Sequence, residues 1–386
     1  MTVLCERFGI SRQAGYKWKQ RYLTLGPAGL EEQSRAPHAH GRTTAEEVAA
    51  AIIALRWERP HWGARKLLAV LDRRHPETAW PAASTVTDIL KRAGLVEGRR
   101  RRRRAMPVER PFQAVEQPND TWCIDFKGWF RTGDGERCDP LTVSDAYSRF
   151  LLACRIMPER SAPVQGAVDA LFREYGLPLA IRSDNGSPFA SQGAAGLSRL
   201  SVHWVKLGIR LERITPGKPQ QNGRHERMHE TLKGETTRPP AASPAEQQKR
   251  FDVFRHDFNF CRPHEALGQQ MPAEHYHPSP RSCPEHELEP WYDADHAVRR
   301  VRSTGEIKWG GELVFISEAV AGEPVGIAET ETGDWLVRFA DIDLGIIDRR
   351  TKRLNRFGAA RPPRGPGRTE ASREPNRNTV NDVSGL

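Results

Sequence analysis

Apolar residues recur at helical spacing over the N-terminal part of the chain. Residues 4–22 predict two short helices that break at Gly9, and Ser11 is placed to cap the second helix. Residues 44–94 contain three further segments with the same periodicity. Both groups have the pattern of a helix-turn-helix module. For the first group, an ordinary amphipathic hairpin is the alternative.

From residue 121 the pattern changes to that of strands. Three β-rich segments come first, and helices then alternate with strands. The strand-like segments are residues 121–130, 139–149, 150–159, 178–184 and 209–214, and the helical ones are residues 162–175, 192–207, 222–235 and 244–260. This order predicts an α/β domain in which helices pack on a mixed sheet.

The C-terminal part begins with short alternating strands and ends in a polar tail. The strands over residues 295–353 predict a small β-barrel. The tail is rich in Pro, Gly and Arg and lacks apolar periodicity, which predicts disorder. The predicted parts are a helix-turn-helix at 1–30, a second helix-turn-helix or winged-helix-like module at 43–97, a basic linker at 98–111, the α/β core at 112–280, the barrel at 295–353 and the tail at 354–386.

Charge and composition narrow the class of partner. The chain has 59 Lys and Arg residues against 49 Asp and Glu residues, a formal net charge of +10. This excess favours polyanions, so nucleic acid is the expected partner. No apolar run has the length of a membrane span or the form of a signal peptide, which predicts a cytoplasmic, nucleoid-associated protein with no membrane partner. The six cysteines lack metal-site spacing and are expected to stay reduced.

Basic and amide side chains in two segments are suited to DNA. In the second predicted helix, Arg12, Gln13 and Lys17 could reach base edges and phosphates in a major groove. Six arginines follow the second helical module, namely Arg99, Arg100, Arg101, Arg102, Arg103 and Arg104. Such a run repels itself too strongly to pack in a core, so it predicts a linker that lies along DNA. A merely solvated charge run is the alternative.

Two aspartates occupy positions where a carboxylate needs a partner. Asp125 lies within an apolar predicted strand, where its charge is costly unless it is paired or bound to a metal. Asp184 ends another apolar strand at an Asn-Gly turn, and ligands bind at such strand ends in α/β sheets. Taken singly, Asp184 could simply cap its turn.

A third carboxylate lies at the start of a predicted helix. Glu226 is in the first turns of the helix that Asn222 is placed to cap. The helix dipole favours an acidic residue there, so Glu226 alone also has a structural explanation. Glu230 lies four residues further on the same face and is the rival candidate.

Together these segments resemble a known family, the integrase core shared by retroviral integrases and bacterial insertion-sequence transposases. The motifs that support the resemblance are WCIDF around Asp125, SDNGSPF around Asp184, PGKPQQNGRHERMHETLK around Glu226, and FNFCRPHEALG after them. Gly223 matches the Gly-x-x-Glu of the family and favours Glu226 over Glu230. The last motif contains Asn259, Arg262, Pro263 and His264 in the order typical of insertion-sequence transposases.

The resemblance implies a ribonuclease-H-like core with a mixed five-stranded sheet, and a metal-dependent DNA transposase. Asp125, Asp184 and Glu226 would then hold Mg²⁺ or Mn²⁺, with two ions expected, for cleavage of element ends and strand transfer. The implied partners are double-stranded DNA, as element ends and as target, and further copies of the chain. The alternatives are a catalytically inactive DNA-binding regulator and a ribonuclease H-like enzyme that acts on RNA.

Several cations near these motifs are candidates for phosphate contacts, with solvated surface charges as the alternative. They are Lys218, Arg224, His225, Arg227 and Lys233, and, in the barrel, Arg299, Arg300, Arg302 and Lys308. Arg262 and His264 could brace the helix of Glu226 or touch DNA, and the sequence leaves both open. The zinc-binding head of retroviral integrases is absent, and the first helix begins close to residue 1, so truncation of the N-terminal module is one interpretation.

Overall fold

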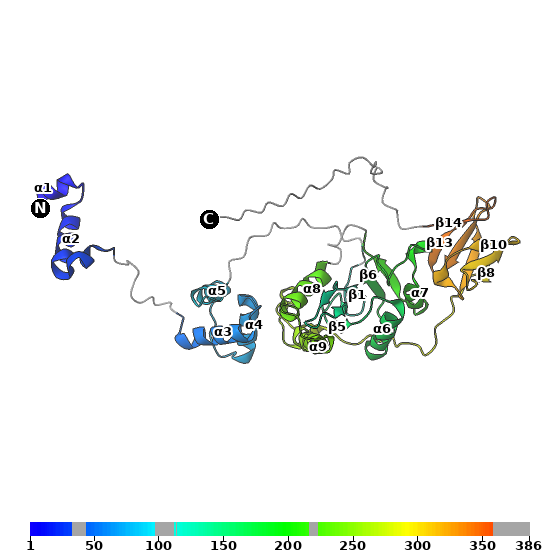
Figure 1. Cartoon of the computed structure of the whole chain (residues 1–386), viewed down its shortest axis with the longest axis horizontal. Coiled ribbons are helices and arrows are strands. Elements are labelled where there is room, and N and C mark those ends of the chain that lie inside the picture. The colour runs from blue at the N-terminus through cyan, green and yellow to red at the C-terminus, as the bar shows by residue number, and fades with distance from the viewer. Residues whose placement is uncertain (33–43, 97–111, 113, 216–222, 358–386) are drawn as a thin grey trace, which may run out of the picture. The chain divides into compact units, whose positions relative to one another are not determined.

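A computed structural model describes residues 1–32, 44–96, 112, 114–215 and 223–357 (Figure 1). The chain divides into two compact units. The first comprises residues 1–60 and 77–96, and the second comprises residues 61–76 and 97–386. The predicted basic linker at 98–111, with Arg99 to Arg104, lies outside the described residues.

The first unit is helical. Helix α1 (Thr2–Arg7) precedes α2 (Arg12–Leu25), and the Ser11 side chain accepts a hydrogen bond from the Ala14 amide at 3.2 Å, which confirms the predicted cap. The two helices pack closely at Gly15, where a Cβ would come within 2.5 Å of the Cys5 sulfur. A short 3-10 helix, η1 (Gly26–Leu30), follows. Helices α3 (Glu46–Glu58) and α5 (Ala83–Arg92) bury apolar residues against each other.

The second unit is built on a five-stranded mixed sheet, as expected. Its strands are β1 (Thr121–Phe126), β4 (Pro140–Asp145), β5 (Leu151–Ile156), β6 (Ala180–Ser183) and β7 (Arg210–Arg213), in the order β5-β4-β1-β6-β7. The first three pair antiparallel, whereas β1, β6 and β7 run parallel. A small hairpin of β2 (Phe130–Arg131) and β3 (Arg137–Cys138) follows β1.

Helices cover both faces of this sheet. Helices α6 (Ser161–Tyr175) and α7 (Arg199–Lys206) share one apolar cluster with it, which includes Trp122 and Ile124 of β1. Helices α8 (Gly223–Thr236) and α9 (Pro244–Phe260) share another, which includes Leu151 and Cys154 of β5. The sheet is therefore the middle layer of three, and β1 lies at its centre (Figure 1).

Side chains of helix α9 also form hydrogen bonds with the backbone of β5, the edge strand of the sheet. The amide side chain of Asn259 accepts from the Leu151 amide at 2.8 Å and donates to the Leu151 carbonyl at 3.0 Å. Gln248 does the same for the Ile156 amide and the Cys154 carbonyl, each at 2.9 Å. An unpaired strand edge invites association with other chains, so these contacts close it. Asn259, the first residue of the family motif, thus has a structural role here.

Two further elements of the second unit lie outside the sheet. Helix α4 (Ala64–Arg74) belongs to the second unit, and its Arg73 forms an ion pair with Glu274 of α10 (Pro272–His275) at 2.8 Å. The 3-10 helix η4 (Glu265–Leu267) lies between α9 and α10.

The predicted helix at 192–207 is shorter in the structure. A 3-10 turn, η2 (Ala194–Gly196), comes first, and α7 begins only after Ser198, which caps it. The break has a local cause, because Ala195 and Gly196 both have positive φ, at 51° and 68°, which interrupts a right-handed helix.

The C-terminal strands form an open sheet. Its members are β8 (Ala297–Arg300), β11 (Pro324–Glu329), β12 (Trp335–Phe339), β13 (Ile342–Ile347) and β14 (Leu354–Arg356), in the order β14-β13-β12-β11-β8. A separate hairpin joins β9 (Glu306–Trp309) to β10 (Glu312–Phe315), and η5 (Glu318–Val320) follows it. The expected closed barrel is not confirmed, because alternation of residues predicts strands but does not predict which edges pair.

This C-terminal sheet packs on the integrase-like core through one shared apolar cluster. Ala194, Leu197 and Val202 from the η2–α7 segment join the buried residues of β9 to β13. Strand β14 lies beyond residue 353, where the sequence placed the start of the disordered tail, and residues 358–386 are outside the described part.

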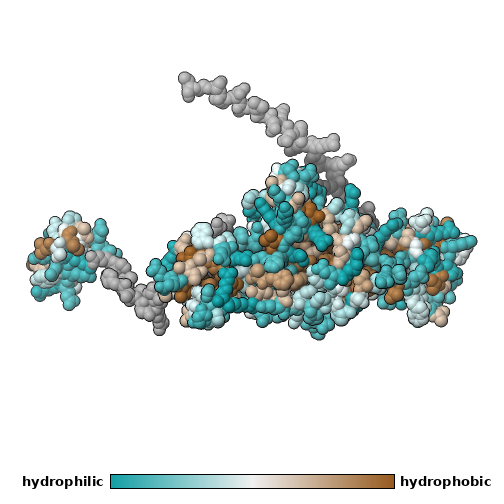
Figure 2. All heavy atoms as spheres, turned by 90° about the horizontal axis from the view of Figure 1, so that it is seen from below, coloured by the Kyte–Doolittle hydropathy of each residue, from teal (hydrophilic) through white to brown (hydrophobic). Residues whose placement is uncertain are grey.

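The surface of the described part is mostly hydrophilic. On the face shown in Figure 2, hydrophilic residues cover most of the surface, and apolar residues form scattered patches. Among the described helices, none combines the length and the apolar character needed to cross a membrane. All six cysteines are free thiols, as predicted.

Candidate active site

Asp125 lies near the end of the central strand β1. It is half-buried and pairs in register with Thr142 of β4. Burial raises the pKa of its carboxyl group, the nearby charges of Asp184 and Glu226 add to this rise, and together they bring the pKa to about 7. Asp184 and Glu226 therefore both lie close enough to Asp125 to disfavour its charged form.

Asp184 follows β6 directly. Because β1 and β6 run parallel, their carboxyl ends meet at the same edge of the sheet, and Asp184 lies at the same edge as Asp125. The turn is held by two contacts: the Gly186 amide donates to the Asp184 carboxylate at 3.1 Å, and the Asn185 side chain donates to the Ile214 carbonyl at 2.6 Å. The turn leaves Asp184 half-buried at the rim.

Glu226 lies in the first turn of α8 and is exposed. Partial loss of water contact raises the pKa of its carboxyl group, and the charge of Glu230 adds to this rise. Asn222, predicted to cap the helix, lies outside the described residues. Glu226 acts electrostatically on Asp125, but its carboxylate is not part of a tight cluster with both aspartates in the described structure.

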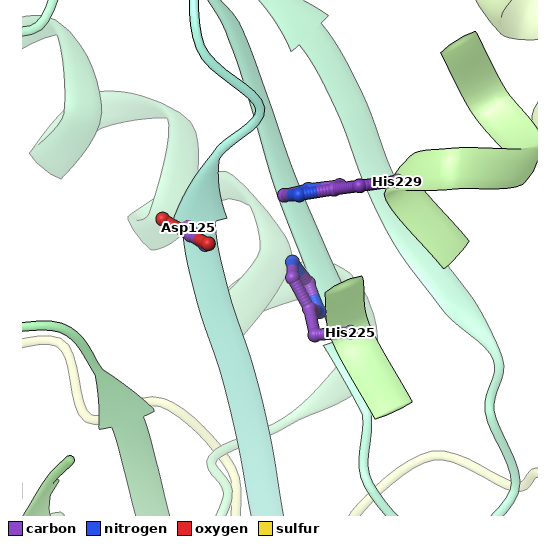
Figure 3. Close-up of side chains that lie close together, drawn as sticks. All are labelled: Asp125, His225 and His229. Atoms are coloured by element: carbon purple, nitrogen blue, oxygen red, sulfur yellow. The ribbon is translucent and has the colours of Figure 1, made fainter. Parts of the chain in front are cut away.

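The tight cluster at this edge of the sheet is Asp125 with His225 and His229. Within the described residues, these three form the group whose possible ligand atoms all lie within 4.8 Å of one another. Figure 3 shows both imidazoles projecting from α8 towards the strands, on the side where Asp125 lies. The proposed phosphate contact of His225 is wrong, because its side chain is only 1% exposed and burial lowers its pKa to about 3.

Both histidines are held by hydroxyl groups of β4. The Thr142 Oγ1 lies 2.8 Å from Nε2 of His225 and 2.7 Å from Nε2 of His229. The Ser144 hydroxyl lies 2.8 Å from Nδ1 of His225. Burial lowers the pKa of His229 to about 2, so both rings are neutral at pH 7.

One signal in the sequence could have located these histidines. His225, Met228, His229 and Leu232 follow the i, i+3, i+4, i+7 spacing of a single helix face, and all four are buried. The apolar Met228 and Leu232 show that this face points to the core, so the two histidines on it must find hydrogen-bond partners there.

Arg213, at the end of β7, is a second residue that the sequence analysis missed. It is half-buried, and among the residues that the structure describes neither terminal guanidinium nitrogen has a hydrogen-bond partner. Burial lowers its pKa, and the carboxylate of Asp184 partly offsets this effect. The structure therefore places an unpaired cation beside the second aspartate.

Other predicted DNA contacts are placed as follows. Arg227 and Lys233 are exposed on α8, and Arg12, Gln13 and Lys17 are exposed on α2. Lys218 and the side chain of Arg224 lie outside the described part of the structure. Lys127 was not among the predicted contacts; burial lowers the pKa of its ammonium group, and the positive charge of Lys233 lowers it further. Arg299, Arg300, Arg302 and Lys308 are exposed on the C-terminal module.

Arg262 braces α8. Its side chain is buried and forms an ion pair with Glu235 near the end of that helix. His264 is half-buried, with its ring edge-on to Phe258 of α9 at a centroid distance of 4.6 Å. Of the two roles left open for Arg262, the structure favours bracing, since a side chain that is 4% exposed has little surface for DNA.

The strand order, the two helical layers and the carboxylates at one sheet edge define an integrase-type core with a ribonuclease-H-like fold. Models of the integrase core domain match residues 115–219 and 207–272, and a homeodomain-like domain matches residues 14–90. The 31.7 kDa protein of insertion element IS407 from Burkholderia multivorans is 30% identical over 280 residues, which cover 71% of this chain and 93% of that protein. The chain belongs to the insertion-element transposases with an integrase core.

Two further similarities cover shorter spans of the chain. The 39.2 kDa protein of insertion element IS476 from Xanthomonas euvesicatoria is 30% identical over 184 residues, 46% of this chain and 50% of that protein. The HTLV-2 integrase catalytic core domain in complex with magnesium covers 42% of this chain and 98% of its own, with 17% identity and a TM-score of 0.34.

Proposed function

We propose that this chain is a DNA transposase that cuts the ends of its element and joins them to target DNA. The single observation behind the proposal is that Asp125 and Asp184 end parallel neighbouring strands at one edge of the sheet, where the charges of Asp184 and Glu226 both raise the pKa of Asp125. Such an arrangement is costly without a cation, and carboxylate oxygens are the ligands that Mg²⁺ and Mn²⁺ prefer.

The residues present fit divalent metal ions of this type. Asp125, Asp184 and Glu226 would hold these ions through their carboxylate oxygens. The imidazoles of His225 and His229 are less suited, because both nitrogens of His225 and Nε2 of His229 are already engaged by Thr142 and Ser144. Bound there, a pair of ions would activate the attacking oxygen and stabilise the leaving oxygen of a phosphodiester.

The chemistry needs no covalent intermediate with the protein. In the first step the oxygen of water bonds to phosphorus, and the bond from phosphorus to the 3′-oxygen breaks, which leaves a 3′-hydroxyl at the element end. In the second step that hydroxyl bonds to a target phosphorus and displaces the target's own 3′-oxygen. One phosphodiester is lost and one is gained in strand transfer, so the second step needs no external energy source.

The protein's side chains would position the DNA. Arg213 and Lys127 act electrostatically on Asp184 and Asp125, and Arg227 and Lys233 are exposed on α8, so these cations would contact phosphates. The exposed Arg12, Gln13 and Lys17 of α2 are placed to read an element end through a major groove. Joining two ends to one target needs at least two active sites, so we propose a homo-oligomer on DNA.

The test uses the full chain and labelled duplexes that tile the DNA on each side of its gene. With Mg²⁺ or Mn²⁺, we expect a nicked end and then a product joined to a second duplex, and we expect Asp184→Asn to lose both products but still bind DNA. Binding without any cleavage would identify an inactive regulator. Cleavage of an RNA–DNA hybrid without strand transfer would identify a ribonuclease H-like enzyme.

A further inference from the structure

The buried histidines of α8 have a role that the carboxylate chemistry does not explain. His225 and His229 are 1% and 7% exposed, and the two β4 hydroxyls they contact, Thr142 and Ser144, are equally buried. A buried polar group costs free energy unless all its donors and acceptors are satisfied. The arrangement of this network therefore constrains which atom carries each proton.

Thr142 determines the network. Its hydroxyl donates to the main-chain carbonyl of Asp125 at 3.1 Å. A hydroxyl has one proton and can accept two hydrogen bonds, so once its proton is used, both Nε2 atoms at 2.7 and 2.8 Å must donate to it. His225 is then protonated on Nε2 alone, and its Nδ1 accepts from the Ser144 hydroxyl.

This arrangement argues against the pair as metal ligands. Nδ1 of His225 uses its lone pair on Ser144, and both Nε2 atoms carry protons. A metal held by His225, or by Nε2 of His229, would have to break these bonds within a buried layer. The nearness of Asp125 to both rings, within 4.8 Å, is instead the consequence of Thr142 lying opposite Asp125 in the sheet.

We propose that Thr142, His225 and His229 are positioning residues that fix the rotation of α8 about its axis and thereby aim Glu226 at the metal site. His225 and His229 lie one turn apart on the face that meets β4, and Glu226 follows His225 by one residue, about 100° around the helix. A rotation of α8 by about 20° would move a carboxylate about 6 Å from the axis by about 2 Å. Errors of that size are enough to disable a catalytic site.

The inference rests on the proposed function for its catalytic consequence, but the network itself can be tested without activity. In full-length protein with ¹⁵N-labelled histidine, we expect two neutral imidazoles protonated at Nε2, assigned by loss of their signals in His225→Gln and His229→Gln. We also expect these signals to stay in place when Mg²⁺ or Zn²⁺ is added. Signals that move with either metal would show coordination and overturn the proposal.

The catalytic consequence is tested with Thr142→Val, which keeps the shape but removes the hydroxyl. We expect the Mg²⁺ concentration for half-maximal end cleavage to rise by about tenfold, the usual effect of residues that orient metal ligands. We expect Thr142→Ser, which keeps the hydroxyl, to need the same Mg²⁺ concentration as the wild type. We expect the Kd for DNA to stay unchanged in both Thr142 variants. Thr236→Val is the matched control, because it removes a buried hydroxyl of α8 that bonds only to the Leu232 carbonyl.

Two outcomes of the variant series overturn the proposal. One is a Thr142→Val protein with wild-type metal dependence, and the other is a Thr236→Val protein with the same shift in metal dependence. If Thr142→Val does not fold, Ser144→Ala replaces it, with a smaller shift expected because only the His225 acceptor bond is lost. If the wild type shows no cleavage at all, the proposed function fails, and the ¹⁵N signals still decide whether the network exists.

Discussion

Thr142 lies opposite Asp125 in the antiparallel pair of β1 and β4, and its hydroxyl is 3.1 Å from the main-chain oxygen of Asp125. The same hydroxyl oxygen contacts both histidines of α8. One uncharged atom thus links the strand of the first carboxylate to the helix of the third. The geometry of the site therefore depends on more than the residues that would hold metal.

The assignment of Glu226 over its rival can be tested directly. Glu226 acts on Asp125 electrostatically, whereas Glu230 raises the pKa of Glu226 rather than that of Asp125. We expect Glu226→Gln to reduce strand transfer by more than about 100-fold, since even residues outside the ligand shell cost about 10- to 100-fold. Glu230→Gln is the matched control and should retain activity. The opposite result would reassign the third ligand to Glu230.

Asp125 predicts a pH dependence of metal binding. Its carboxyl has a pKa of about 7 in the absence of metal, so it holds a proton below pH 7 and is ionised above. A metal must displace that proton, so the apparent Mg²⁺ affinity should rise by about tenfold between pH 6 and pH 8. The measurement is the rise in thermal midpoint on adding Mg²⁺ at each pH, with NaCl of equal ionic strength as the control.

Asp125→Asn supplies the contrast for that experiment. The amide has no proton to lose in this range, so its remaining response to Mg²⁺ should be the same at pH 6 and pH 8. If the wild-type protein responds equally at both pH values, its Asp125 is ionised throughout, and burial beside Asp184 and Glu226 does not govern its titration.

The position of the aspartates could be predicted because it depends on local sequence. An apolar run predicts a buried strand, and an aspartate within it or directly after it is located by that strand. Asp125 lies in β1 and Asp184 directly follows β6, as these patterns predict. Helix α9 was likewise predicted at its observed bounds, because Ser243 and Pro244 mark its start. These features require no knowledge of distant segments.

The hydroxyl network could not be predicted, since its partners are far apart along the chain. Thr142 and His225 are 83 residues apart, and only the pairing of β4 beside β1 places the hydroxyl beneath α8. For the same reason, the sequence did not predict that the C-terminal sheet is open, because the pairing of its edge strands depends on segments far apart along the chain. The burial of Arg213 could not be predicted either, because an arginine in a strand with two other charged residues is typical of an exposed edge strand.

Arg262 should matter for stability and not for DNA binding. It is buried and paired with Glu235, and removing one partner of a buried ion pair typically costs about 3–5 kcal/mol. We expect Arg262→Ala to lower the free energy of unfolding by about 3 kcal/mol, with the Kd for DNA unchanged under conditions where the variant is folded. Lys249→Ala removes an exposed cation of α9, the helix just before Arg262, and should change stability little. A loss of DNA affinity without a loss of stability would show that Arg262 contacts DNA instead.

Arg213 predicts opposite effects on stability and on DNA binding. Its guanidinium nitrogens have no partner in the described structure, and burial of an unpaired charge is destabilising. Arg213→Met keeps the length of the side chain without the charge, so we expect its thermal midpoint to rise while its affinity for element-end DNA falls. Because one phosphate contact would be lost, the slope of log Kd against log salt concentration should decrease by about 0.9. Arg210→Gln removes a charge from the same strand that is already paired with Glu212, and it should leave the salt dependence closer to that of the wild type. An Arg213→Met protein that is less stable and binds DNA with unchanged salt dependence would show that the side chain serves the fold alone.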